Sequence, residues 1–256
     1  MNKRRRRIIM LCVIIFAGAV SLVCERSAVE IYDPQLNIYS VLHSDHASQS
    51  VIVDRTYRMD EPAGPVIDDA LVILSSWSSV DTLTFDQGSD AYWTYNLILQ
   101  PLTEYSLMVW RDGFDTLYAR TTLPGPFTIL YPEHFDTVTF SDTVVLTKSD
   151  HAAVYAVSFG DEFGMFFEPP DTSDSLMIIP LAEVFSGWSP GNFFCRLWVA
   201  ACDSNFYRYY DEMNNDPDVT GIDGGVGLFG SLWIESVDMF VSMVDAGKSQ
   251  STHTEP

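Results

Sequence analysis

The sequence predicts an all-β protein made of two tandem β-sandwich domains, with one short helix in the second domain. Along most of the chain, short runs rich in Val, Ile, Tyr, Phe and Thr alternate with Gly, Pro, Asp and Ser, which is typical of strands joined by turns. In one such run, Phe193, Cys195, Leu197, Val199 and Ala201 share one face, and all five are apolar. That face is expected to be the core side of a sandwich.

The candidate strands are short and rich in β-branched and aromatic residues. They include Leu36–Leu42, Val51–Tyr57, Ala70–Ser75, Tyr105–Trp110, Leu117–Thr122, Thr143–Lys148, Ala153–Phe159, Phe193–Ala201 and Ser231–Val241. One helix is expected at about 204–213, where Asp203 can cap the first turn and Phe206 and Tyr210 lie four residues apart.

The best internal boundary is the segment Leu123-Pro124-Gly125-Pro126, because two prolines and a glycine cannot continue a β-ladder. We therefore predict an N-terminal sandwich over residues 24–124 and a C-terminal sandwich over residues 125–243. Residues 244–256 end in a stretch without apolar side chains and are expected to be a flexible tail.

The charge balance argues against some classes of partner. The chain has 256 residues, with 35 Asp and Glu, 14 Lys and Arg, and a net charge of −21. Such an acidic protein repels phosphate backbones and anionic lipid headgroups. We therefore expect no nucleic-acid partner, and any membrane contact is expected through an N-terminal lipid alone.

The N-terminus predicts export. Met1–Arg7 is strongly basic and Ile8–Val23 is uncharged, which is the layout of a signal peptide over residues 1–23. The uncharged run is short for a membrane span, which takes about 20 residues.

Two processing routes stay open. One is cleavage at the A-x-A site of Ala17 and Ala19, and the other is processing before Cys24 with a lipid on its sulfur, as in bacterial lipoproteins. Ser21 and Val23 depart from the usual lipoprotein signal, which has Leu three residues before the cysteine and a small residue just before it. An uncleaved signal anchor is the remaining alternative.

Cys195 and Cys202 are the cysteines of the mature chain besides Cys24. On one extended strand they would lie about 23 Å apart at ~3.3 Å per residue, whereas a disulfide needs Cα atoms within about 7 Å. Two interpretations remain: two small buried apolar side chains, or a bridge that requires the strand to end between them.

Leu99, Pro101, Thr103 and Tyr105 form an L-x-P-x-T-x-Y string that resembles the penultimate-strand motif of fibronectin type III domains. The likeness implies that Tyr105 closes a corner between sheets, with a buried ring and a hydroxyl bonded to nearby backbone. The second half resembles another sandwich of the same fibronectin- or immunoglobulin-like type.

The string GIDGGVGLFG at 221–230 resembles the closing signature of the domain of unknown function 4249 family, whose members are exported, predicted bacterial lipoproteins. The likeness implies a bacterial cell-envelope location in the periplasm or outer membrane, a β-sandwich fold, and an outer-membrane receptor as the kind of partner. It carries over no catalytic residue and no cofactor.

The same glycines satisfy G-x-G-x-x-G over Gly225–Gly230, with Asp245 about 20 residues later, as in dinucleotide-binding folds. That fingerprint needs a following helix, whereas Leu232–Val241 has the composition of a final strand. We therefore expect a glycine-permitted tight turn or bulge with close backbone approach, and no cofactor.

His43, Asp45 and His46 follow the first strand and offer two imidazoles and a carboxylate, a set that suits zinc or copper. Three ligands within four residues seldom close a site alone, so a solvated hairpin turn is the favoured interpretation and a metal site the weaker one.

Asn214, Asp216 and Asp218 lie in an acidic loop whose oxygen ligands suit calcium, but their spacing does not fit an EF-hand. A helix end followed by a turn is favoured there, with a calcium site as the alternative.

Catalytic signals are weak. No G-x-S-x-G elbow occurs, and the adjacent Asp150 and His151 would point to opposite faces of a strand. Trp77 and Trp188, each beside Ser in an expected loop, are candidates for a sugar or peptide platform.

The leading hypothesis is a non-enzymatic exported envelope protein that acts as an accessory or binding subunit. One alternative is a hydrolase or carbohydrate-active enzyme whose site assembles only in three dimensions, using His43, His46 or a carboxylate pair. The other is a purely structural β-sandwich module.

Overall fold

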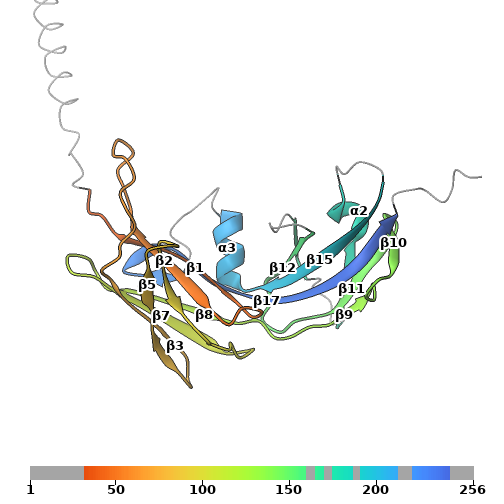
Figure 1. Ribbon diagram of the computed structural model, residues 1–256, viewed down its shortest axis with the longest axis horizontal. Helices are drawn as coiled ribbons and strands as arrows, with labels where there is room; N and C mark the ends of the chain where they lie inside the picture. Colours follow the sequence, from red (N-terminus) through yellow and green to blue (C-terminus); the bar gives the residue numbers. More distant parts are fainter. Residues whose placement is uncertain (1–31, 160–164, 170–174, 187–190, 213–220, 243–256) are drawn as a thin grey trace, which may run out of the picture. The chain divides into compact units, whose positions relative to one another are not determined.

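A computed structural model describes residues 32–159, 165–169, 175–186, 191–212 and 221–242 (Figure 1). The predicted signal peptide, Cys24, Trp188, the loop bearing Asn214, Asp216 and Asp218, and the predicted tail lie outside the described residues. Among those residues, no helix combines the length and the apolar character needed to cross a membrane.

The largest sheet has nine strands in the order β13-β12-β15-β17-β1-β2-β6-β5, with β10 paired to β17. Its strands come from both halves of the chain. They are β1 (Leu36–His43), β2 (Gln49–Arg55), β5 (Thr84–Asp86), β6 (Ala91–Thr94), β10 (Thr137–Thr139), β12 (Val154–Ser158), β13 (Met165–Phe167), β15 (Asn192–Cys202) and β17 (Gly225–Ser242).

Two smaller sheets and two helices complete the described fold. The five-stranded sheet has the order β16 (Ile222–Asp223), β8 (Leu117–Thr122), β7 (Glu104–Trp110), β3 (Leu71–Ser75) and β4 (Val80–Thr82). The three-stranded sheet has the order β14 (Leu176–Pro180), β11 (Thr143–Thr147) and β9 (Ile129–Tyr131). The helices are α2 (Leu181–Val184) and α3 (Ser204–Glu212).

The long strand β17 joins the two halves of the large sheet. Its first residues pair in parallel with β1, from Leu36 opposite Gly225 to His43 opposite Leu232. Its later residues pair antiparallel with β15, up to Asn192 opposite Ser242. The two sandwiches therefore share one continuous sheet.

Each half of that sheet covers its own hydrophobic core. The core beneath β1, β2 and β6 is closed by β3, β7 and β8 of the five-stranded sheet. The core beneath β12, β15 and β17 is closed by β11 and β14 of the three-stranded sheet. The all-β sandwich fold is thus confirmed, while the boundary at residues 124 and 125 stays a prediction.

Glycine permits the close approach of β1 and β17. Gly227 has a φ of 119°, and a Cβ added there would lie 1.9 Å from the carbonyl oxygen of Ile38. The predicted close backbone approach is present, but the prediction of a tight turn or bulge is wrong, because the pairing of β1 with β17 runs through Gly225–Gly230 without a shift in register. The glycines belong to β17, because the parallel pairing with β1 extends the strand to Gly225.

Tyr105 is 2% exposed, and its hydroxyl oxygen accepts a hydrogen bond from the backbone N–H of Gln100 at 2.7 Å. The corner expected at Tyr105 is therefore confirmed. The second sandwich has a counterpart that the sequence analysis missed, since the buried Tyr155 hydroxyl accepts the backbone N–H of Ser149 at 2.6 Å.

The strand β15 also settles the cysteine alternatives. It runs without interruption through Cys195 and Cys202, and both are free thiols. Since no turn separates them, the disulfide alternative is wrong and the two side chains pack into opposite faces of the sheet.

Candidate binding pocket

One face of the large sheet carries helix α3 in place of a second sheet. In Figure 1, α3 stands on the opposite side of β17 from β9 and β11. Its residue Phe206 packs with Ala156, Ala200, Cys202 and Leu232 of that face. The helix is anchored as predicted, because Asp203 Oδ1 accepts the backbone N–H of Phe206 at 2.9 Å.

The helix covers only part of this face, and a pocket of about 700 Å³ lies beside it. This volume is within the range of about 300–1,000 Å³ that small-molecule sites occupy. The pocket is lined by residues of β1, β2, β6, β13, β17, α3 and the turn between β1 and β2, namely Tyr39, Ser40, Val41, His43, His46, Ser48, Gln49, Ser50, Ile52, Trp93, Phe166, Phe206, Tyr210 and Leu232.

Aromatic rings form one wall of the pocket. Tyr210 lies one helical turn after Phe206, with ring centroids 4.6 Å apart, and its ring is 6.0 Å from that of Phe166 on β13. The Tyr210 hydroxyl is 3.0 Å from the hydroxyl of Tyr39 on β1. Burial, followed by the hydrogen bond with Tyr39, raises the pKa of Tyr210, so the Tyr210 hydroxyl stays protonated at neutral pH.

The rings in this wall remain accessible to solvent. Tyr39 is 41% exposed, Phe166 is 40% exposed and Tyr210 is 39% exposed. Ile52, directly opposite Tyr39 on β2, is 38% exposed. The face between β2 and α3 therefore leaves large apolar side chains partly uncovered, which is characteristic of an interaction surface.

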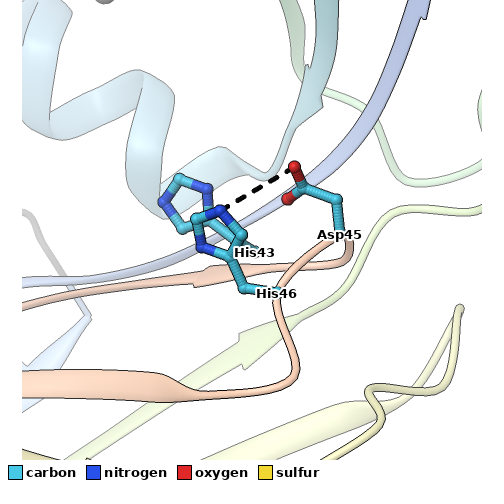
Figure 2. A group of neighbouring side chains, drawn as sticks. All are labelled: His43, Asp45 and His46. Carbon is cyan, nitrogen blue, oxygen red and sulfur yellow. Dashed lines mark ion pairs between the residues drawn. The ribbon is translucent and has the colours of Figure 1, made fainter.

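A polar turn between β1 and β2 supplies another part of the lining. His43 and His46 stack with ring centroids 4.9 Å apart and an interplanar angle of 13°, and His46 Nε2 lies 3.9 Å from Asp45 Oδ2 (Figure 2). Burial, and then the neighbouring His46, lower the pKa of His43, so its imidazole is neutral at physiological pH.

The side chain of Gln49 fixes the backbone of this turn through three hydrogen bonds. Its side chain is 2% exposed, and its Oε1 accepts the backbone N–H of His43 at 2.9 Å. Its Nε2 donates to the carbonyl oxygens of His43 at 3.0 Å and His46 at 2.7 Å. A single buried amide thus holds the backbone on either side of Asp45.

A second, smaller cavity of about 230 Å³ lies at the N-terminal end of α3 and includes Asp203 in its lining. Asp203 Oδ1 also accepts the backbone N–H of Ser231 at 3.2 Å, and Oδ2 accepts the hydroxyl of Thr121 on β8. Burial raises the pKa of this carboxyl. Its contacts join α3, β8 and β17, so we assign Asp203 to the fold.

The structure brings some of the site residues predicted from the sequence together and not others. The structure brings His43, Asp45 and His46 together, with ligand atoms all within 4.8 Å of one another. Trp77 is 83% exposed in the turn between β3 and β4 and does not line the pocket. Trp188 cannot be placed, because it lies outside the described residues.

The aromatic wall of the pocket was not predicted from the sequence. The available signal was in β1, where Leu36, Ile38 and Leu42 face the core while Tyr39 and Val41 occupy outward positions that are also apolar. A strand that is apolar on both faces is typical of a sheet with contacts on both sides. That pattern indicates a further partner for the outer face.

No family model and no curated protein matches this chain. Solved structures with a similar arrangement include a biofilm-associated protein BSP domain, with 11% identity and a TM-score of 0.23 over 83% of this chain and 30% of that one. This chain thus spans less than a third of that protein's length. A two-domain fibronectin type III segment of chicken tenascin matches with 11% identity and a TM-score of 0.22 over 83% of this chain and 100% of that one. Murine CEACAM1b matches with 12% identity and a TM-score of 0.22 over 81% and 100%.

Proposed function

We propose that this chain is a non-enzymatic binding protein whose ligand occupies the pocket beside α3. The observation that carries the proposal is a cavity of about 700 Å³ walled by aromatic rings that are about two-fifths exposed. Concave, mainly apolar sites with a few polar groups are the usual form of a ligand pocket.

The lining indicates the chemistry of the ligand. Tyr39, Phe166 and Tyr210 offer flat apolar surfaces, while the hydroxyls of the tyrosines and the neutral imidazole of His43 offer hydrogen bonds. The net charge of −21 disfavours anions. A neutral ligand with one apolar face and several hydroxyl groups, such as a saccharide, meets these conditions.

The proposal also includes the cellular location of the protein. The basic leader Met1–Arg7, the apolar run Ile8–Val23 and Cys24 support export to a bacterial cell envelope, with a lipid on Cys24 as one form of anchorage. The glycine string at 221–230 supports kinship with the domain of unknown function 4249 family and, through it, an outer-membrane receptor as partner. Mass spectrometry of the mature N-terminus tests the anchor, and pull-down of the natively anchored protein tests the partner.

The pocket is tested with a neutral fluorescent probe, N-phenyl-1-naphthylamine, titrated into the purified chain. We expect saturable binding at one site, weakened at least about tenfold by Phe166→Ala, since tenfold corresponds to about 1.4 kcal/mol of lost contact. Phe240→Ala is the matched control, because Phe240 on β17 is similarly exposed at 45% and does not line the pocket. Equal losses in the two variants would contradict the proposal.

A saccharide array probed with the same variants identifies the ligand. Retention of a neutral glycan by the wild type and by Phe240→Ala, with loss in Phe166→Ala, supports the saccharide class. Turnover of the retained glycan would instead support the hydrolase alternative. Absence of any retained ligand, together with unsaturable probe fluorescence, would support a purely structural module.

A further inference from the structure

The turn between β1 and β2 holds three metal-binding groups, and two of them, His43 and His46, line the pocket. The ligand atoms of His43, Asp45 and His46 all lie within 4.8 Å of one another. Figure 2 shows the two imidazole rings one above the other and the Asp45 carboxylate turned toward His46. Since β1 ends at His43, the strand itself places the first of these groups.

The backbone that carries these groups is fixed by contacts outside the turn. Besides the three hydrogen bonds of Gln49, the backbone N–H of Ser44 donates to the carbonyl oxygen of Leu232 at 3.1 Å. The Ser44 hydroxyl in turn accepts the backbone N–H of Ile234 at 3.0 Å. Residues from β17 thus brace the turn, and this preorganisation lowers the ordering cost of binding an ion.

The imidazole rings of His43 and His46 do not hydrogen-bond to the rest of the described structure, and His46 Nε2 lies 3.9 Å from Asp45 Oδ2. Two stacked rings without hydrogen-bonded partners, beside a carboxylate, form a donor set that a cation can complete. The net charge of −21 also favours cations near this surface.

We propose that His43, Asp45 and His46 form a binding site for a divalent transition metal ion of the Zn²⁺ or Cu²⁺ class. Two imidazole nitrogens and one carboxylate oxygen suit these ions, whereas Ca²⁺ and Mg²⁺ prefer oxygen ligands alone. This inference goes beyond the proposed binding of a neutral ligand and does not depend on it.

Coordination of one ion by all three groups requires their side chains to rotate. With metal–nitrogen bonds of about 2.0–2.1 Å, two ligand atoms of a tetrahedral site lie about 3.3 Å apart. Asp45 and His46 are exposed, so rotation about their side-chain bonds can close the remaining gap without moving the braced backbone. Three protein ligands leave the fourth position open, as in zinc sites that bind an exchangeable group. Because His43 and His46 both line the pocket, an ion held between them would lie beside it.

The test is isothermal titration calorimetry of the untagged full chain with ZnCl₂ and, separately, CuCl₂ in a non-chelating buffer. We expect at least one of the two ions to bind with a site whose affinity falls at least about tenfold in His46→Gln and in Asp45→Asn. His134→Gln and His151→Gln are matched controls that keep the total number of histidines equal to that of His46→Gln. His134 is exposed and lies beside Asp238, so it repeats the imidazole–carboxylate pair without a second imidazole.

Histidine ring resonances in a proton–nitrogen NMR spectrum give a second readout. Titration with an ion that binds in the calorimetry is expected to shift (Zn²⁺) or broaden (Cu²⁺) the resonances of His43 and His46 and to leave those of His134 unchanged. The proposal would be overturned if His46→Gln bound Zn²⁺ with the same affinity as the wild type and also bound Cu²⁺ with the same affinity as the wild type. An equal loss of affinity in His134→Gln would also overturn it.

Discussion

Replacing Gly227 with alanine tests the parallel contact between β1 and β17, two strands that each contribute residues to the lining of the pocket. The new Cβ would lie 1.9 Å from the carbonyl oxygen of Ile38 and 2.8 Å from the Asn37 side-chain oxygen. A backbone oxygen cannot swing away as a flexible side chain can, so one strand must move. The residue would also be held at a φ of 119°, which only glycine adopts readily.

The two costs can be estimated separately. Backbone strain of this kind amounts to about 1–3 kcal/mol. Loss of two ladder hydrogen bonds as β1 shifts adds roughly 1–3 kcal/mol, at about 0.5–1.5 kcal/mol each. The sum of about 2–6 kcal/mol is a large part of the roughly 5–15 kcal/mol that stabilises a typical domain.

Urea unfolding followed by tryptophan fluorescence measures this loss, and two other glycines separate its causes. A Cβ at Gly191 meets nothing within 4 Å, so Gly191→Ala is expected to change the free energy of unfolding by less than about 1 kcal/mol. Gly113 has equal space but a φ of 85°, so Gly113→Ala is expected to show the strain alone. A Gly227→Ala variant no less stable than Gly113→Ala would refute the pairing of β1 with β17.

Three further predictions follow from buried polar groups. Tyr105→Phe and Tyr155→Phe should each lower the free energy of unfolding by about 1–3 kcal/mol, because each leaves a backbone N–H without its partner; an unchanged urea midpoint in either variant would contradict this. Burial raises the pKa of Asp203 above its ordinary 3.8, so the folded state keeps that proton to higher pH than the unfolded chain does. The stability that Asp203 contributes is therefore full below about pH 4 and is lost as the pH rises through the folded-state pKa. Asp203→Asn keeps a good helix cap and should remove this pH-dependent loss of stability. If the free energies of unfolding of the wild type and the variant changed equally with pH, the raised pKa of Asp203 would be contradicted. Burial raises the pKa of Cys195 to about 11, which leaves about a thousandth of the Cys195 thiol as thiolate at pH 8, and Cys202 is fully buried. Both thiols should therefore react with a disulfide reagent far more slowly in the native protein than in urea. Equal reaction rates in the two conditions would contradict this prediction.

Local patterns were sufficient for the strands and the helix that bury one apolar face. In β7, Tyr105, Leu107 and Val109 alternate with less buried residues, and all three lie in the first core. In α3, the cap at Asp203 and the position of Phe206 agree with the expected helix. In both elements the period of apolar residues matches the backbone geometry, so neighbours in sequence determine the result.

Other features depend on contacts between distant residues. The first third of β17 is rich in glycine, which has a low strand propensity, and it is extended through its pairing with β1. The strands β4, β5 and β13 have three residues each and are too short to show a period of two. The pocket combines Tyr39 and Tyr210, which lie far apart in sequence and meet only because α3 packs across the large sheet.

The cluster of His43, Asp45 and His46 could be predicted from the sequence only in part. The residue types and spacing were evident, but a turn of that composition can point its side chains in several directions. Their orientation depends on the buried amide of Gln49, whose hydrogen bonds to both histidine backbones are a tertiary feature. A hairpin turn was the favoured expectation, and the structure adds that this turn gathers its three metal-binding groups on one side.

The most direct test of the binding pocket is the measurement of nuclear Overhauser effects between bound N-phenyl-1-naphthylamine and the aromatic rings of the protein. The account predicts contacts from the naphthyl ring to Tyr39, Phe166 and Tyr210. Contacts to Phe240 or Trp77 with none to those three rings would show that the probe prefers another surface, and the assignment of the binding site would then be wrong.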